Sequence, residues 1–94
     1  VTLVSNIASP LVTGPTVTFT AMGSGGSGSY EYQFIRRLTS SSVVEVVQGY
    51  STKNTWTWPT AAAPAGSYYV RVDVRNVGSV AATEALRTIV YMLE

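Results

Sequence analysis

The sequence of 94 residues contains no cysteine and no histidine. Without cysteine the chain can form neither a disulfide nor a thiolate metal site. Without histidine it lacks the commonest metal ligand and the usual general base near neutral pH. Most of the side chains from which active sites are assembled are therefore missing, and we expect neither enzyme activity nor a bound metal or cofactor.

Charged residues are also scarce, since they make up 12% of the chain against a typical value of about 25%. Six basic and five acidic side chains give a net charge of +1, and the only adjacent basic pair is Arg36-Arg37. Proteins that bind nucleic acid use several arginine or lysine contacts to phosphate. We therefore expect neither nucleic acid nor an anionic membrane as a partner.

Long apolar runs are absent as well, and none approaches the length of about 20 residues that crosses a bilayer. Serine, threonine and glycine must solvate most of the surface, which is common in secreted and cell-surface β domains. The chain starts at Val1 without a methionine or signal peptide, and it ends in Leu93-Glu94, which is either native or a vector remnant. We expect residues 1–94 to be one domain of a larger protein, with neighbouring domains as its nearest partners.

What the sequence does contain is a regular alternation of apolar and polar residues, the pattern of half-buried β-strands. In TVTFTAM, residues 16–22, Val17, Phe19 and Ala21 alternate with threonine and methionine. Comparable runs bounded by turn residues predict seven strands, at about residues 3–8, 16–22, 30–38, 43–48, 54–58, 66–76 and 84–92. Together they predict an all-β fold, a seven-stranded antiparallel sandwich of two packed sheets.

Only one segment, AATEALRTIVYML, residues 81–93, has a composition that also suits a helix. Its second half is β-branched and aromatic, and it lies where the last strand of a sandwich is expected. We therefore predict a strand in this segment.

Residues 66–76 follow the pattern G-x-Y-x-V-x-V-x-V-x-N, which resembles the penultimate strand of bacterial immunoglobulin-like domains. Polycystic-kidney-disease-type repeats and their fibronectin-III-like relatives share it, although YEYQF lacks the Trp-Asp-Phe-Gly-like motif of the former. SGGSGSYEYQF and NTWTW resemble tandem repeats of large bacterial surface and secreted proteins. The resemblance implies an immunoglobulin-like β-sandwich that is a non-catalytic extracellular or cell-surface module, a structural spacer or protein-interaction domain. Carbohydrate-binding accessory modules are the alternative within such folds.

Tyr68 follows Gly66 at the start of an inward-facing row of valines. A tyrosine in this place can return its hydroxyl to the backbone of a nearby loop, the tyrosine-corner arrangement. We expect this hydrogen bond to stabilise the fold.

The polar faces of residues 30–38 and 66–76 should meet if these strands are antiparallel neighbours. Glu31 then lies near Arg75, and Gln33 lies near Asp73. Ile35 similarly lies near Arg71. Opposite charges on adjacent strands stabilise a sheet, so we expect a flat, solvated face with internal charge pairs.

Residues 23–28, GSGGSG, match the dinucleotide-binding pattern G-x-G-x-x-G. That motif requires a strand before it and a helix after it, whereas a β pattern follows here. We interpret the match as a loop between strands.

The remaining parts of an active site are not assembled either. The chain has many serines but no histidine to activate one, and its only lysine is Lys53, in a turn. The carboxylates are Glu31, Glu45, Asp73, Glu84 and Glu94. They form no aspartate-rich loop of the kind that supplies 6–8 oxygen ligands to Ca²⁺.

Aromatic side chains are the best candidates for a contact site. Trp56 and Trp58 lie on one face of a strand by alternation, and we expect that face to be buried between the sheets. If they were exposed, two coplanar indoles with Tyr50 or Tyr69 would form a platform for stacking on the sugars of a polysaccharide. Tyr69, Arg71 and Tyr50 are the candidate contact residues for a ligand or partner.

VVEVVQ, residues 43–48, is the other candidate for contact with a second protein. We predict an apolar strand at the edge of a sheet, where it could pair with another chain or a neighbouring domain. Glu45 would be the charge that discourages indiscriminate pairing. The alternative is an ordinary edge strand packed on the core.

Overall fold

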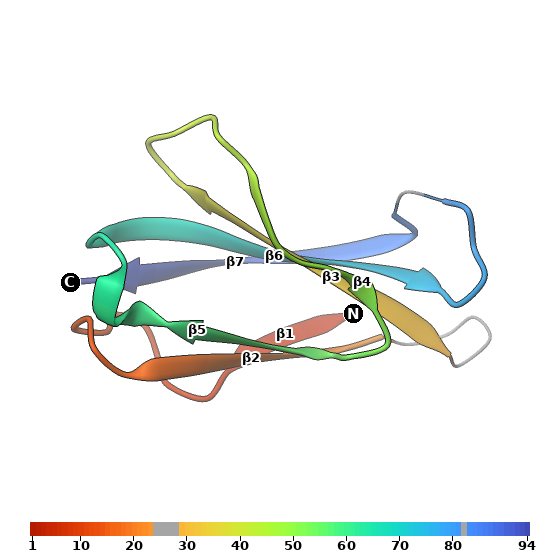
Figure 1. Ribbon diagram of the computed structural model, residues 1–94, viewed down its shortest axis with the longest axis horizontal. Helices are drawn as coiled ribbons and strands as arrows, with labels where there is room; N and C mark the ends of the chain where they lie inside the picture. The colour runs from red at the N-terminus through yellow and green to blue at the C-terminus, as the bar shows by residue number, and fades with distance from the viewer. Residues whose placement is uncertain (24–28, 82) are drawn as a thin grey trace.

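The computed structural model describes residues 1–23, 29–81 and 83–94. Its strands form two antiparallel sheets with the orders β1-β2-β5 and β4-β3-β6-β7, packed face to face (Figure 1). The strands are β1 (Thr2–Ser5), β2 (Thr16–Met22), β3 (Tyr30–Leu38), β4 (Glu45–Ser51), β5 (Thr55–Pro59), β6 (Gly66–Asn76) and β7 (Ala85–Leu93). The predicted seven-stranded antiparallel sandwich is confirmed.

Most strands lie close to their predicted positions, and β7 confirms a strand in the segment that also suited a helix. β4 begins at Glu45 rather than at residue 43 and continues to Ser51. A single turn of 3₁₀ helix, η1 (Thr60–Ala62), was not predicted. Residues 24–28, which carry most of the G-x-G-x-x-G match, lie outside the described residues.

The prediction for the first strand was wrong at its end, because β1 stops at Ser5. The Asn6 side chain accepts the Thr18 N–H at 2.8 Å, in place of a backbone carbonyl. The chain then crosses to the other sheet. There the Leu11 N–H donates to the Met92 carbonyl at 3.0 Å, and the Glu94 N–H donates to the Leu11 carbonyl at 2.8 Å. The end of β7 is therefore covered by the chain's own N-terminal segment.

The core lies between the sheets and is built from the alternating apolar positions. Phe19 is at its centre, stacked on Trp56 at 5.4 Å between ring centroids and edge-on to Tyr91 at 5.4 Å. Such offset and edge-to-face pairs stabilise a core beyond the area they bury. The other fully or nearly fully buried members are Leu3, Val17, Ala21, Tyr32, Phe34, Trp58, Tyr68, Val70, Val72, Val74 and Leu93.

Tyr68 forms the predicted tyrosine corner. Its hydroxyl donates to the Pro64 carbonyl at 2.7 Å, and its ring meets Trp58 edge-on at 4.9 Å. Gly66 makes room for this corner, because a Cβ there would lie 3.3 Å from a methyl carbon of Leu38. The φ of +148° at Gly66 also disfavours any side chain.

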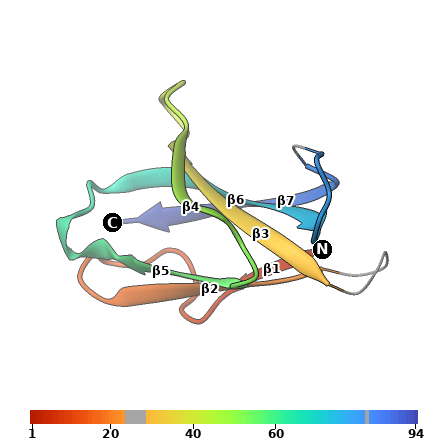
Figure 2. The same ribbon diagram turned by 45° about the vertical axis from the view of Figure 1, so that its right-hand side comes forward.

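The sandwich measures 39 × 26 × 16 Å along its principal axes. The C-terminus lies at one end of the long axis, and the N-terminus lies on the other side of its midpoint, inside the loops of the far end (Figure 1). Figure 2 shows the two sheets from a second direction. Within the described residues, no helix has the length and apolar character required to cross a bilayer.

Candidate functional site

The outer face of the four-stranded sheet carries the candidate residues. β3 and β6 pair in the predicted register, with Glu31 opposite Arg75, and Gln33 opposite Asp73. At the Glu31 end, Arg75 Nε donates to a Glu31 carboxylate oxygen at 3.0 Å. The Arg75 guanidinium also lies 4.0 Å from the centre of the Tyr50 ring. Tyr50 is therefore already covered on one side by a cation.

The expectation of a flat, solvated face was wrong at Asp73 and Ile35. Their exposed fractions are only 2% and 7%, respectively. Arg71 Nε lies 2.9 Å from one Asp73 carboxylate oxygen, and Gln33 Nε2 donates to the other at 3.3 Å. The long side chains of Arg71 and Gln33 bind this short carboxylate from both neighbouring positions, which keeps it from water.

A shallow depression of about 250 Å³ lies on this same outer face. Its lining comes from β3, β6, β7 and the segment before β4: Ile35, Arg37, Val44, Tyr69, Arg71 and Thr88. We call it the outer depression. Two of the three candidate residues, Tyr69 and Arg71, are brought together here, whereas Tyr50 is not among the lining residues.

Arg37 is a lining residue that the sequence analysis did not select. The signal for Arg37 was present in the pattern, because alternation along β3 places it outward and directly opposite Tyr69. Its guanidinium lies 4.6 Å from the centre of the Tyr69 ring. Arg37 Nη1 also donates to the Ser41 carbonyl at 2.6 Å. Val44 belongs to residues 43–48, the apolar segment that the sequence analysis selected for contact with a second protein, and it lies just outside the β3–β4 ladder.

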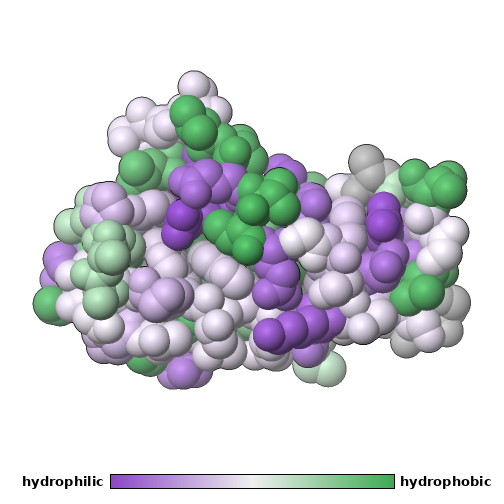
Figure 3. Space-filling model, in the orientation of Figure 1, coloured by the Kyte–Doolittle hydropathy of each residue, from purple (hydrophilic) through white to green (hydrophobic). Residues whose placement is uncertain are grey.

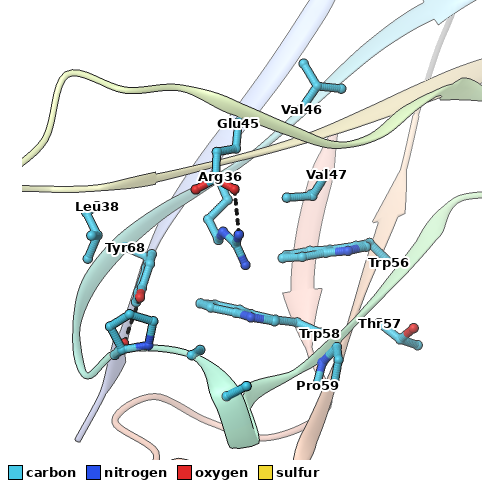
Figure 4. Close-up of a pocket in the computed structure, with 13 residues that line it drawn as sticks. Arg36, Leu38, Glu45, Val46, Val47, Trp56, Thr57, Trp58, Pro59 and Tyr68 are labelled. Atoms are coloured by element: carbon cyan, nitrogen blue, oxygen red, sulfur yellow. Dashed lines mark hydrogen bonds and ion pairs between the residues drawn. The ribbon is translucent and has the colours of Figure 1, made fainter.

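A second and larger cavity, of about 510 Å³, opens where β4 and β5 form the edges of the two sheets. We call it the edge cleft. Arg36 lies over the Trp58 ring at 5.1 Å, and its Nη2 lies 2.7 Å from a Glu45 carboxylate oxygen (Figure 4). Trp56 and Trp58 stack on each other at 5.5 Å.

The two indoles are buried, as predicted, with exposed fractions of 7% for Trp56 and 3% for Trp58. Their faces contact each other, Phe19 and Arg36. They therefore do not form a surface platform for sugar rings. Tyr69 and Tyr50 each have an arginine over the ring, so neither offers two open faces for stacking.

Three exposed valines lie at the start of β4 and in the segment before it; Val44 lines the outer depression, and Val46 lines the edge cleft. Val43, Val44 and Val46 have exposed fractions of 66%, 56% and 58%. The chain between β3 and β4 extends away from the sandwich, and Figure 3 shows apolar surface over it. The prediction that β4 is an edge strand is confirmed by the sheet order. The role of Glu45 as a charge that limits strand pairing stays a prediction.

The charges of the two cavities differ. Across residues 1–23, 29–81 and 83–94, a carboxylate lies within ion-pair distance of Arg36, Arg71 and Arg75, but none lies that close to Arg37. The edge cleft is lined by one arginine and one glutamate, whereas the outer depression is lined by two arginines and no carboxylate. The outer depression therefore has an excess of positive charge, even though Asp73 pairs with Arg71.

Glu84, in the turn between β6 and β7, belongs to neither cavity. Its carboxylate accepts the backbone N–H of Asn76 at 2.8 Å. This hydrogen bond, together with one from Ser79, holds the pKa of Glu84 below its ordinary value. The carboxylate therefore closes the turn through its hydrogen bond to Asn76.

No group of three or more Asp or Glu side chains that could hold a metal ion occurs within the described ranges. Comparison of the chain with protein-family models, with curated proteins and with solved structures finds no significant match.

Proposed function

We propose that this chain is a non-catalytic module of a secreted or cell-surface bacterial protein, an immunoglobulin-like sandwich that serves as a spacer and contacts another protein. Its strand order supports the immunoglobulin-like assignment. β1 and β2 pair in one sheet, whereas the next pair along the chain, β3 and β4, belongs to the other sheet, as in that architecture. The low charge and the abundance of serine, threonine and glycine support a location outside the cell.

The observation that carries the spacer role is the position of the chain ends. They lie on opposite sides of the midpoint of the 39 Å axis, with the C-terminus at one end (Figure 1). Chain attached to Val1 and to Glu94 would leave the module in opposite directions, so modules joined in series would extend rather than fold back. The stacked aromatic core between them makes each module a stiff unit.

The spacer role is tested with a tandem protein in which Glu94 of one copy is joined directly to Val1 of the next. We expect small-angle X-ray scattering to give a maximum dimension well above the 39 Å of one module. A control with a long glycine-serine linker should give a broader distribution of distances. A direct tandem as compact as two modules side by side would contradict the proposal.

A further inference from the structure

We propose that the outer depression binds a carboxylate side chain flanked by apolar residues on a partner protein. This inference rests on the proposed role of the module in protein contact, and it specifies the surface and the chemistry of the partner.

Charge complementarity indicates the carboxylate. Arg37 and Arg71 line the outer depression without a lining carboxylate. Asp73 pairs with Arg71 and is itself 2% exposed, so it cannot reach a ligand. Arg37 donates to the neutral Ser41 carbonyl, and no carboxylate of the described residues lies within ion-pair distance of it. A bound anion would supply the charge that Arg37 lacks and would form charge-assisted hydrogen bonds, the stronger kind.

The two guanidinium groups are held in place before any partner arrives. Arg37 is fixed by the Tyr69 ring at 4.6 Å and by Ser41 at 2.6 Å. Arg71 is fixed by two contacts to Asp73, at 2.9 and 3.2 Å. Binding therefore does not have to order two long side chains, which removes a cost that usually weakens surface contacts.

The apolar requirement comes from the residues around the charges. Ile35 is 7% exposed and lines the depression. Val46 on β4 lies opposite Ile35 on β3. Val90 on β7 lies opposite Tyr69 on β6. Val44, Val46 and Val90 are 56%, 58% and 56% exposed, so they remain available to a partner. A free anion would leave these valines in water, whereas a carboxylate between apolar side chains would cover them.

The size of the depression favours a side chain over a whole small molecule. Its volume of about 250 Å³ is smaller than the range of about 300–1,000 Å³ for pockets that enclose a drug-sized ligand. The surrounding apolar surface extends onto β4 and β7, so a segment of a partner protein can contact more of it than an isolated carboxylic acid can.

The experiment uses the ¹⁵N-labelled chain and two capped tripeptides, acetyl-Leu-Glu-Leu-amide and its isosteric control acetyl-Leu-Gln-Leu-amide. We expect the glutamate peptide to shift the backbone amide signals of Tyr69, Arg71 and Thr88, with a dissociation constant in the range of about 1–10 mM. The glutamine peptide should bind about tenfold more weakly, because it loses the charge-assisted bonds. Added salt should weaken only the glutamate peptide.

Two variants locate the site, with a matched control. Arg37→Gln should weaken the glutamate peptide about tenfold. Arg87→Gln removes the same charge from an exposed arginine of β7 outside the lining and should leave binding unchanged. Thr88→Glu places a carboxylate at the depression without removing an existing contact of Arg37. It should abolish binding even if Arg37→Gln perturbs the fold.

The proposal is overturned if neither peptide shifts these amides at about 10 mM, or if both peptides bind equally. Shifts confined to the edge cleft around Arg36 would also overturn it. A failure here leaves the dimensions of the tandem protein unaffected, so the spacer role and the binding site are judged separately.

Discussion

Arg36 and Arg37 are adjacent in the sequence and lie on opposite faces of β3. Each guanidinium lies over an aromatic ring, Arg36 over Trp58 at 5.1 Å and Arg37 over Tyr69 at 4.6 Å. On the inner side, Glu45 pairs with Arg36 at 2.7 Å. On the outer side, Arg37 donates to a neutral carbonyl, and no carboxylate in the described part of the chain pairs with it. An arginine over an aromatic ring is therefore neutralised by a carboxylate on the inner face, whereas on the outer face its positive charge is not neutralised.

The difference shows that an arginine–aromatic pair does not by itself indicate a binding site. Around Arg36 the ring is 3% exposed and belongs to the core, so the pair closes the edge of the sandwich. Around Arg37 the ring is half-buried and is surrounded by exposed valines, so the pair remains available to a partner. What distinguishes the two is the burial of the ring and the presence of a carboxylate.

The largest expected effect comes from removing the ring beneath each arginine. Trp58→Ala should lower the free energy of unfolding by about 3–5 kcal/mol, because it leaves a cavity among Phe19, Trp56 and Tyr68. Tyr69→Ala should cost about 1 kcal/mol, the value of a partly exposed cation–π contact. Urea unfolding followed by circular dichroism measures both. Equal losses would show that the inner and outer faces are not energetically distinct.

The buried carboxylate on the outer face gives the next effect in size. Asp73→Asn should cost about 1–3 kcal/mol, because it replaces one of two carboxylate oxygens that accept from Arg71, one of which also accepts from Gln33. Arg71 is 40% exposed, so solvent screening keeps the loss below that of a fully buried pair. Glu31→Gln, at a carboxylate that is 23% exposed, is the matched control and should cost less than about 1 kcal/mol. Urea midpoints that do not differ would show that Asp73 behaves as a solvated charge.

Alternation along the chain predicted which side chains share a face, because successive residues of a strand point to opposite sides. It gave β2 and β3 with their observed ends and the pairing of Glu31 with Arg75. It also placed Trp56 and Trp58 in the core. These features depend on period and register alone, so a single sequence contains them.

The features that were not predicted depend on contacts between distant segments. Asp73 is buried because Gln33 and Arg71 bind over it, and alternation alone cannot distinguish it from a solvated charge. The early end of β1 depends on an Asn6 side chain that bonds to Thr18. The outer depression needs Val44, whose segment leaves the ladder with β3. The sequence therefore predicted which residues lie on each face of the sheets, but not which of the outer residues are buried or form a depression.

Removing only the hydroxyl group from Tyr68 and from Tyr69 compares the inner and outer faces with a smaller change than removing a whole ring. Tyr68→Phe should cost about 0.5–1.5 kcal/mol, because it removes the 2.7 Å hydrogen bond to Pro64. Tyr69→Phe keeps the ring beneath Arg37 and should change the urea midpoint very little. Equal losses would show that the tyrosine corner contributes no specific stability.

Alkaline pH provides an independent check on the inner tyrosines. Burial raises the pKa of Tyr68 and of Tyr91 above the ordinary value of 10.0. The unfolded chain therefore releases these protons first, so their contribution is complete below pH 10 and falls as the pH rises through the folded pKa values. Tyr68→Phe should make the loss of stability above pH 10 less steep. If Tyr68→Phe left the slope of stability against pH unchanged above pH 10, burial would not raise the pKa of Tyr68.

The smallest effect concerns the ion pairs themselves. A double-mutant cycle on Glu31 and Arg75 should give a coupling energy of about 0.2–1 kcal/mol, because the pair joins adjacent strands with side chains that are 23% and 25% exposed. The cycle on Glu45 and Arg36 should give a coupling at the low end of that range, because Glu45 is 57% exposed and water screens its charge. The nitrogen–oxygen distance is 2.7 Å for Arg36 and Glu45 and 3.0 Å for Arg75 and Glu31, so distance alone would predict the larger coupling energy for Glu45 and Arg36. A larger coupling energy for Glu45 and Arg36 than for Glu31 and Arg75 would therefore mean that the shorter distance outweighs solvent screening at the edge cleft. The carboxylate of Glu45 would then stabilise the position of Arg36 as well as neutralise its charge.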